Sequence, residues 1–199
     1  MAFGYHDSGM TIYDLFRPDL LGSLCGVSEF ALAIGKRSGS NATSADRGSL
    51  RLLWIVIGLG VVLAILAANF VPQASSAWLA SQRISGGVLF LLGMALRWFA
   101  ILYLGRFFTV NVAIALDQHV IDTGPYRLVR HPSYSGSLLQ FVGLGITFGN
   151  WLSLALLVLP VTAVYLRRIT IEEQALSDGL GESYRRYMAR TRRLIPGIY

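Results

Sequence analysis

Charged residues are scarce in this chain of 199 residues, where they make up 14% of the sequence and apolar residues make up 54%. A typical soluble domain contains about 25% charged residues. The mean hydropathy, +0.54, is high as well. This composition favours a protein that spans a lipid bilayer, and a soluble bundle of long amphipathic helices is the alternative.

Cysteine and histidine are also scarce, since the chain has one cysteine, Cys25, and three histidines, His6, His119 and His131. A single cysteine forms no internal disulfide, and Cys25 lies in an apolar stretch where a packing role is expected. These four residues lack the spacing of zinc ligands, so we expect no metal site. The first ten residues also lack the basic and apolar regions of a secretory signal.

Long apolar runs are what the chain has instead. Residues 52–71 contain no charge, and residues 84–104 contain one, Arg97. Each run reaches the length of about 20 residues that a membrane helix needs. A third run, residues 135–166, extends over 32 residues and is interrupted by "GNW" at 149–151. Because it is too long for one span and short for two, it predicts a helical hairpin of two brief or tilted helices.

A shorter apolar run, residues 20–34, contains Glu29 and is interpreted as a further span. The sequence therefore predicts an all-α integral membrane bundle of about five transmembrane helices. A charge inside a membrane helix requires a partner. Glu29 is the candidate partner for Arg97, in an ion pair that we expect to be purely structural.

The basic residues gather in alternate connections of this bundle. They concentrate in residues 36–51, 105–130 and 167–193, whereas Arg17 and Arg83 fall on the other side. The positive-inside rule then predicts an external N-terminus and a cytoplasmic C-terminus. The net charge of +6 is explained by this sorting, so we expect contact with membrane lipids and no nucleic-acid partner.

Most polar residues outside the connection 38–49 fall in two segments, 105–134 and 167–199. These segments flank the same helical hairpin, 135–166. A tight hairpin returns both of its ends to one membrane face, so we expect the two segments to be neighbours in space. The sequence predicts one cytosolic pocket, built from the 105–134 loop and the C-terminal helices.

The segment "RRITIEEQAL", residues 167–176, continues a membrane helix, so helical spacing applies to it. Arg168, Glu172 and Leu176 are four residues apart and share a face, with Glu173 one position round. The alternative to a functional role is a surface salt bridge worth a few tenths of a kcal/mol. Poor solvation at the bilayer edge weighs against that alternative.

The segment "GPYRLVRHPSY" combines a turn and a helix start. Gly124 and Pro125 indicate a turn, and the proline after His131 indicates that a helix begins at Pro132. Free N–H groups at a helix start favour an anion, such as a ligand carboxylate or phosphate. The alternative is a capped helix whose Arg127 and Arg130 only anchor to lipid headgroups.

Other kinds of site find little support. The chain has no G-x-S-x-G motif of a nucleophile elbow, although Ser133 is close to His131. The glycine clusters "GLGVVL" and "GLGITFG" lie inside membrane helices, where glycines allow close packing. The pairs Gly22–Gly26 and Gly145–Gly149 fit the same interpretation.

Taken together, "GPYRLVRHPSYSG", an apolar hairpin, "RRITIEEQAL", "GESYRRY" and "RLIPGIY" resemble the isoprenylcysteine carboxyl methyltransferase family, which is related to membrane phospholipid methyltransferases. The resemblance covers residues 85–199. "DRGSLRLLW" and "LGRFFTV" further resemble bacterial members. The resemblance implies a five-helix enzyme of the bacterial inner membrane. We expect one domain over residues 1–199, with N-terminal helices in 13–71 and a catalytic core in 85–199.

The resemblance also implies the cofactor S-adenosylmethionine, with S-adenosylhomocysteine as product. Matching positions place the cofactor against Gln118, His119, Val120, Ile121, Tyr126, His131, Pro132, Ser133, Tyr134 and Glu172. Asn111 is a weaker match to a family glutamine. Arg168 matches the arginine that handles the substrate carboxylate, so Arg168 and Glu172 are the expected catalytic residues.

The function that this resemblance implies is methyl transfer to a lipophilic acceptor, above all carboxyl methylation of a prenylcysteine-like substrate. A lipid amine or a small thiol would use the same cofactor pocket. The alternative enzyme class is an NADPH-dependent membrane reductase of the sterol-reductase type, which has a similar C-terminal tail. A small membrane scaffold without catalysis is the third hypothesis.

Overall fold

Helices form almost all of the structure, a computed structural model that describes residues 11–35, 43–44, 48–108, 113–114 and 117–199. The long helices are α2 (Pro18–Gly35), α3 (Ser49–Phe70), α5 (Arg83–Leu104), α6 (Pro132–Thr147) and α7 (Trp151–Leu180). The short ones are α1 (Ile12–Leu15), η1 (Pro72–Ala74), α4 (Ala77–Ser81), η2 (Gly105–Phe107), η3 (Gly124–Arg127) and α8 (Glu182–Arg190). Strands β1 (Thr43–Ser44) and β2 (Ala113–Ile114) pair antiparallel.

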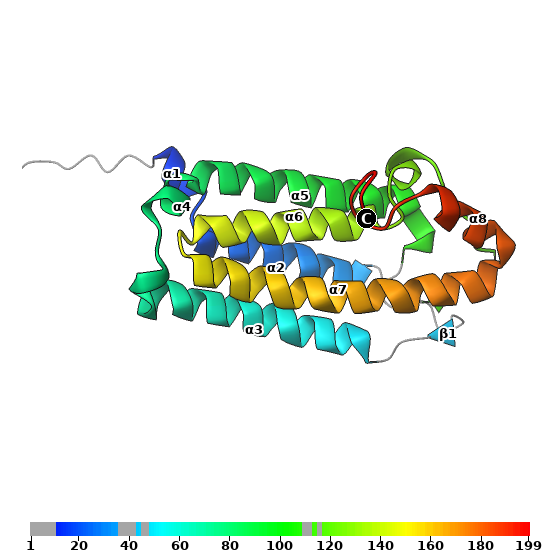
Figure 1. Cartoon of the computed structure of the whole chain (residues 1–199), viewed down its shortest axis with the longest axis horizontal. Helices are drawn as coiled ribbons and strands as arrows, with labels where there is room; N and C mark the ends of the chain where they lie inside the picture. Colours follow the sequence, from blue (N-terminus) through cyan, green and yellow to red (C-terminus); the bar gives the residue numbers. More distant parts are fainter. Residues whose placement is uncertain (1–10, 36–42, 45–47, 109–112, 115–116) are drawn as a thin grey trace, which may run out of the picture.

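The five long helices run side by side, with α4 at one end of the bundle and α8 at the other (Figure 1). Each coincides with a predicted apolar run, so the all-α membrane fold is confirmed. By length and composition, α3, α5 and α7 are able to cross a membrane. Helices α2 and α6 are shorter, at 18 and 16 residues, and the number of five spans stays a prediction.

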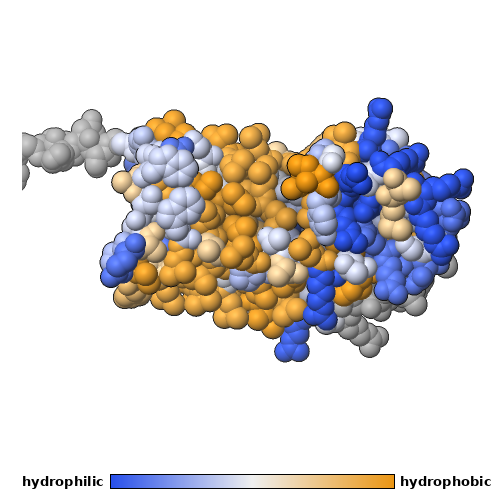
Figure 2. Space-filling view, viewed as in Figure 1, coloured by the Kyte–Doolittle hydropathy of each residue, from blue (hydrophilic) through white to orange (hydrophobic). Residues whose placement is uncertain are grey.

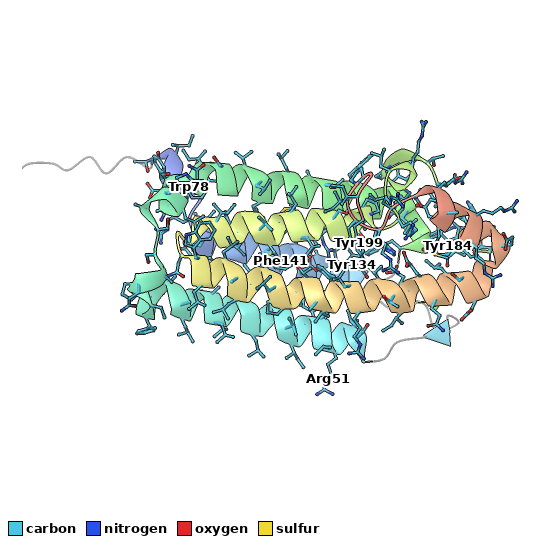
Figure 3. The ribbon with its side chains drawn as sticks, in the orientation of Figure 1. Arg51, Trp78, Tyr134, Phe141, Tyr184 and Tyr199 are labelled. Atoms are coloured by element: carbon cyan, nitrogen blue, oxygen red, sulfur yellow. The ribbon has the colours of Figure 1, made fainter. Side chains whose placement is uncertain are left out.

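Apolar residues cover the middle of the bundle on the face shown in Figure 2, and polar residues gather at the α8 end. In the most apolar window of α3, only 22% of the window is buried inside the protein, so most of this apolar stretch needs lipid around it. The exposed ring of Trp78 lies at the α4 end (Figure 3) and stacks on the exposed ring of Trp151, with centroids 6.1 Å apart. Tryptophan is typical of membrane interfaces. The chain is an integral membrane protein.

The predicted hairpin turn is present at Gly149 and Asn150. Gly149 has φ +66°, a conformation that residues with a Cβ rarely adopt. The Asn150 side chain caps α7 by accepting a bond from the Ser153 N–H at 3.0 Å, and it donates to the Val71 carbonyl at 3.0 Å. The turn is thus tied to the end of α3. Of the two alternatives for the hairpin, brief or tilted helices, brief does not hold for α7, which continues as predicted through 167–176 and ends at Leu180 after 30 residues.

Glycines bring the backbones of α5 and α6 into direct contact. A Cβ on Gly93 would lie 2.4 Å from the Gln140 nitrogen, and one on Gly143 would lie 2.4 Å from the Phe90 nitrogen. The predicted packing role of Gly22 and Gly26 is wrong, because nothing lies within 4 Å of a Cβ at either position. Gly145 and Gly149 have the same four-residue spacing but are packed, since a Cβ on Gly145 would lie 2.4 Å from Leu154 Cδ1. Spacing alone therefore did not distinguish a packed helix face from a lipid-facing one.

This difference predicts opposite effects of one substitution. Alanine is favoured over glycine in a helix by about 1 kcal/mol, so Gly22→Ala should leave stability unchanged or raise it. Gly93→Ala forces a methyl group against the α6 backbone and should cost about 1–3 kcal/mol. Thermal unfolding in detergent micelles measures both. Equal melting temperatures for the two variants would contradict the close contact between α5 and α6.

Candidate active site

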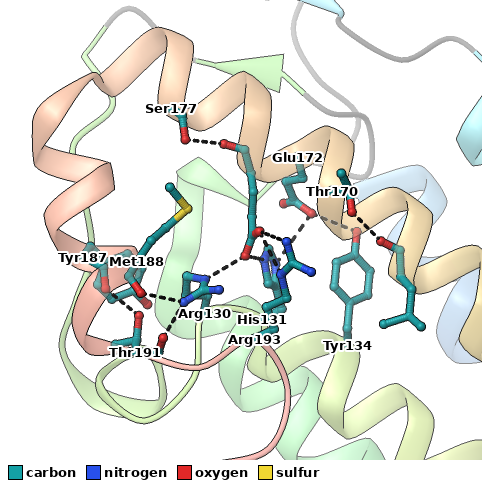
Figure 4. Close-up of polar contacts among 12 residues, drawn as sticks. Arg130, His131, Tyr134, Thr170, Glu172, Ser177, Tyr187, Met188, Thr191 and Arg193 are labelled. Atoms are coloured by element: carbon teal, nitrogen blue, oxygen red, sulfur yellow. Dashed lines mark hydrogen bonds and ion pairs between the residues drawn. The ribbon is translucent and has the colours of Figure 1, made fainter. Parts of the chain in front are cut away.

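The hairpin brings the start of α6 next to the second half of α7. The Tyr134 hydroxyl lies 3.1 Å from Glu172 Oε2, and His131 Nδ1 lies 3.9 Å from the same oxygen. Figure 4 shows these side chains pointing toward one another from the two helices. The prediction that the two polar segments are neighbours is confirmed.

A cavity of about 1200 Å³, including its open mouth, lies at this junction. Ten of the predicted site residues line it: Gln118, His119, Val120, Ile121, Tyr126, His131, Ser133, Tyr134, Arg168 and Glu172. Pro132 does not line it, because Pro132 is buried as the first residue of α6. Asn111 lies outside the described residues.

Arg168 is buried at 4% exposure, so the alternative of a surface salt bridge is wrong. Its Nε donates to the Tyr134 hydroxyl at 2.8 Å, and its Nη1 donates to Ser49 Oγ at 3.0 Å. The Tyr134 hydroxyl in turn donates to Glu172. One hydroxyl therefore accepts from the arginine and donates to the carboxylate, which holds both side chains at the cavity wall.

The cavity also has an apolar wall that sequence reasoning did not find. Leu32 of α2 and Leu50, Leu53 and Trp54 of α3 line it together with the polar residues. These residues belong to helices that precede the motifs in the sequence. Nothing local marks them as lining residues, because lipid-facing and cavity-facing leucines look alike in a membrane helix.

The predicted ion pair inside the bundle is present, with Arg97 Nη2 2.8 Å from Glu29 Oε2. Both residues are buried, at 7% and 6% exposure. The expectation of a purely structural pair was incomplete, because both side chains also line the cavity.

Glu173 has a central role at this site that its sequence position next to Glu172 did not reveal. Its carboxylate contacts Arg130 Nε at 2.7 Å, Arg193 Nη2 at 2.8 Å and His131 Nε2 at 3.3 Å. Figure 4 labels these three partners. We call these four residues the Glu173 cluster. Arg130 therefore binds Glu173, and the alternative in which Arg130 only anchors to lipid headgroups does not hold. The hydrogen bond from Arg193 to this carboxylate also raises the pKa of the arginine.

The C-terminal tail closes over the start of α6. The His131 N–H donates to the Arg193 carbonyl at 3.0 Å, and Ser135 Oγ donates to the Leu194 carbonyl at 2.6 Å. The N–H groups of Tyr134 and Ser135 bond to the His131 carbonyl. The helix start thus offers fewer free N–H groups to an anion than predicted, because the tail and the first turn use several of them.

The loop residues complete the mouth of the cavity. The Tyr126 hydroxyl donates to the Ala100 carbonyl at 3.2 Å, and burial raises its pKa, so it stays protonated. His119 is exposed and meets Phe107 edge-on, with ring centroids 5.1 Å apart. Tyr184 and Tyr187 of α8 form a further wall.

Comparisons with known proteins agree with this arrangement. The phospholipid methyltransferase family matches residues 81–183. The chain is 30% identical over 173 residues to a probable protein-S-isoprenylcysteine O-methyltransferase of Oryza sativa subsp. indica, covering 86% of this chain and 90% of that protein. Protein-S-isoprenylcysteine O-methyltransferase B of Arabidopsis thaliana is also 30% identical, covering 86% of this chain and 87% of that protein. The chain belongs to this methyltransferase family.

A solved structure shows the same membrane fold for the methyltransferase. The eukaryotic intramembrane Ras methyltransferase, an isoprenylcysteine carboxyl methyltransferase, matches with a TM-score of 0.67 and 25% identity. The match covers 91% of this chain and 65% of that protein, so the chain spans slightly less than two thirds of its length. Family membership decides for methyl transfer among the functions considered from the sequence.

The methyltransferase should depend on the Tyr134 hydroxyl for stability. Tyr134→Phe removes the hydroxyl that accepts from Arg168 and donates to Glu172, and the loss of these two buried hydrogen bonds should cost about 1–3 kcal/mol. Tyr103→Phe is the matched control, because its hydroxyl bonds Thr123 at an exposed position, and we expect a change within about 0.5 kcal/mol. Thermal unfolding in detergent measures both. Equal losses would contradict the bridging role of Tyr134.

Proposed function

We propose that this methyltransferase uses S-adenosylmethionine to methylate the carboxylate of a lipophilic, prenylcysteine-like acceptor. The observation that carries the proposal is the composition of the cavity described above. Polar residues from 118–134 and Glu172 form one part of it, Arg168 stands beside them, and leucines and a tryptophan of α2 and α3 form the other part. A charged cofactor and a greasy acceptor thus have matching walls in one space.

The residues present fit S-adenosylmethionine by their chemistry. Bound there, the cofactor supplies an electrophilic methyl group on a positively charged sulfonium. Glu172, whose side chain is 32% exposed, places a negative charge at the cavity wall and offsets positive charge on a ligand. Arg130 lines the cavity and offers N–H donors to a ligand carboxylate, and the His131 ring lines the cavity beside it. Tyr126, Tyr184 and Tyr187 offer ring faces to a planar base.

Arg168 is the residue we assign to the acceptor. An acceptor carboxylate is already deprotonated at neutral pH, so the transfer needs no general base. It needs alignment, with the attacking oxygen about 3–3.5 Å from the methyl carbon. The guanidinium orients a carboxylate through forked contacts, and its own orientation is set by Tyr134 and Ser49. A lipid amine or a thiol would in addition need a group to take its proton.

The arrangement in the membrane follows from the acceptor. A lipophilic chain reaches Leu32, Leu53 and Trp54 from the bilayer, whereas the cofactor reaches the α8 end from water. We propose that this end faces the cytoplasm of a bacterium, with the N-terminus on the outer side of the inner membrane. The basic residues of α8 and its flanks agree with this orientation.

The direct test is a transfer assay with radiolabelled S-adenosylmethionine and purified enzyme. N-acetyl-S-farnesylcysteine should acquire label that mild base releases as methanol, because a methyl ester is base-labile. Base-stable label on a lipid amine or a thiol would replace the acceptor in this proposal and retain the cofactor. Thermal stabilisation by NADPH, with none by S-adenosylhomocysteine, would overturn the proposal as a whole.

Two variants should separate the two parts of the cavity. Lysine keeps the charge of Arg168 and loses its fork, so Arg168→Lys should raise the KM for the acceptor about 10–100-fold and leave cofactor binding nearly unchanged. Glu172→Gln should instead raise the dissociation constant of S-adenosylhomocysteine. Steady-state kinetics and calorimetry measure the two effects, and the reverse pattern would contradict both assignments.

A further inference from the structure

The structure assigns a positioning role to Glu173: it fastens the C-terminal tail and α8 to the start of α6 and thereby builds the cofactor-binding part of the cavity. This inference rests on the proposed function. It goes beyond that function because Glu173 does not line the cavity and so touches neither cofactor nor acceptor.

Adjacent carboxylates on α7 differ sharply in their access to the cavity. Glu172 lines the cavity, and its side chain is 32% exposed. Glu173 does not line it, and its side chain is 7% exposed. Any influence of Glu173 on a ligand must therefore pass through the residues that it holds.

Two residues of the Glu173 cluster, Arg130 and His131, do line the cavity. A carboxylate accepts hydrogen bonds only, so His131 Nε2, 3.3 Å from Glu173 Oε1, carries a hydrogen. The other ring nitrogen, Nδ1, then faces Glu172 at 3.9 Å. Glu173 thus sets both the tautomer and the ring orientation that His131 presents at the cavity wall.

The Glu173 carboxylate also holds the tail and α8, whose tyrosines form another wall of the cavity. Arg193 of the tail donates to this carboxylate through Nε at 3.0 Å and Nη2 at 2.8 Å. Arg130, bound to the other oxygen, donates through Nη1 to the carbonyl oxygens of Met188 and Thr191, where α8 ends. Helix α8 carries Tyr184 and Tyr187, so one buried group positions both the first turn of α6 and the tyrosine wall (Figures 3 and 4).

Removing the negative charge leaves Arg130 and Arg193 close together with no compensating carboxylate. Their repulsion should move the tail and α8 away from His131, since two unpaired cations in a poorly solvated site separate or draw in water. The cavity then exists less often in its binding-competent form. The expected result is weaker cofactor binding and an almost unchanged rate once cofactor is saturating.

The test compares Glu173→Gln with Arg193→Gln and with Glu182→Gln in the full-length enzyme. Glu173→Gln should raise the dissociation constant of S-adenosylhomocysteine and the KM for S-adenosylmethionine about tenfold, and change kcat less than about threefold. Arg193→Gln removes the contact of the tail with Glu173 through the partly exposed partner of the pair, and it should also raise both constants. Glu182→Gln is the matched control, because its pair with Arg185 is exposed, and it should change neither constant.

The double variant Glu173→Gln/Arg193→Gln should bind no more weakly than Glu173→Gln alone, because the two substitutions break one contact. Glu173→Asp, which keeps the charge, should recover part of the affinity. Calorimetry with S-adenosylhomocysteine provides the dissociation constants, and tryptophan fluorescence with gel filtration confirms folding. If Glu173→Gln fails to fold, Arg193→Gln and its comparison with Glu182→Gln decide the question.

Unchanged dissociation constants in folded Glu173→Gln or Arg193→Gln would overturn the positioning role, even if the melting temperature fell. A loss confined to kcat would overturn it as well. The wild-type measurement separates this inference from the proposed function: if wild-type enzyme binds no S-adenosylhomocysteine, the function itself fails and the inference with it. If wild-type enzyme binds and the variants bind equally well, only the inference fails.

Discussion

Helix α7 can return alongside α6 because Gly149 adopts φ +66° and Asn150 caps the next helix while bonding α3. This turn places the first residues of α6 and the second half of α7 at the same end of the bundle. The direct contact of α5 with α6, which Gly93 permits, then holds the hairpin against the rest of the protein. The contacts of Arg168, Glu172 and Glu173 span this hairpin or extend from it.

A membrane environment explains why the polar residues at this end form connected groups. Isolated charges at the bilayer edge are poorly solvated, so each must find a partner. Arg168 reaches Glu172 through the Tyr134 hydroxyl, and Glu173 pairs with Arg130 and Arg193. The neighbouring residues Glu172 and Glu173 thus have different roles. Glu172 lines the cavity, and Glu173 fixes residues that form its walls.

Much of the bundle was predictable, because hydropathy and helical period are local properties. The apolar runs, the break at 149–151 and the helix start at Pro132 all appear where the sequence places them. The motif residues that resemble the family also converge on one cavity. The prediction for Gly22 was wrong because a glycine on a helix face packs only if another helix lies opposite, and that depends on the whole arrangement.

The sequence by itself determined that the chain is a helical membrane protein and which motif residues meet, since a charge-free run must be in lipid and a short hairpin must return to its starting face. Only the tertiary structure decided which of two adjacent glutamates faces the cavity, that Arg130 binds Glu173, and that leucines of α2 and α3 form the acceptor wall. These contacts join residues far apart in the chain. They depend on helix rotation and on the path of the tail, for which no single segment carries a signal.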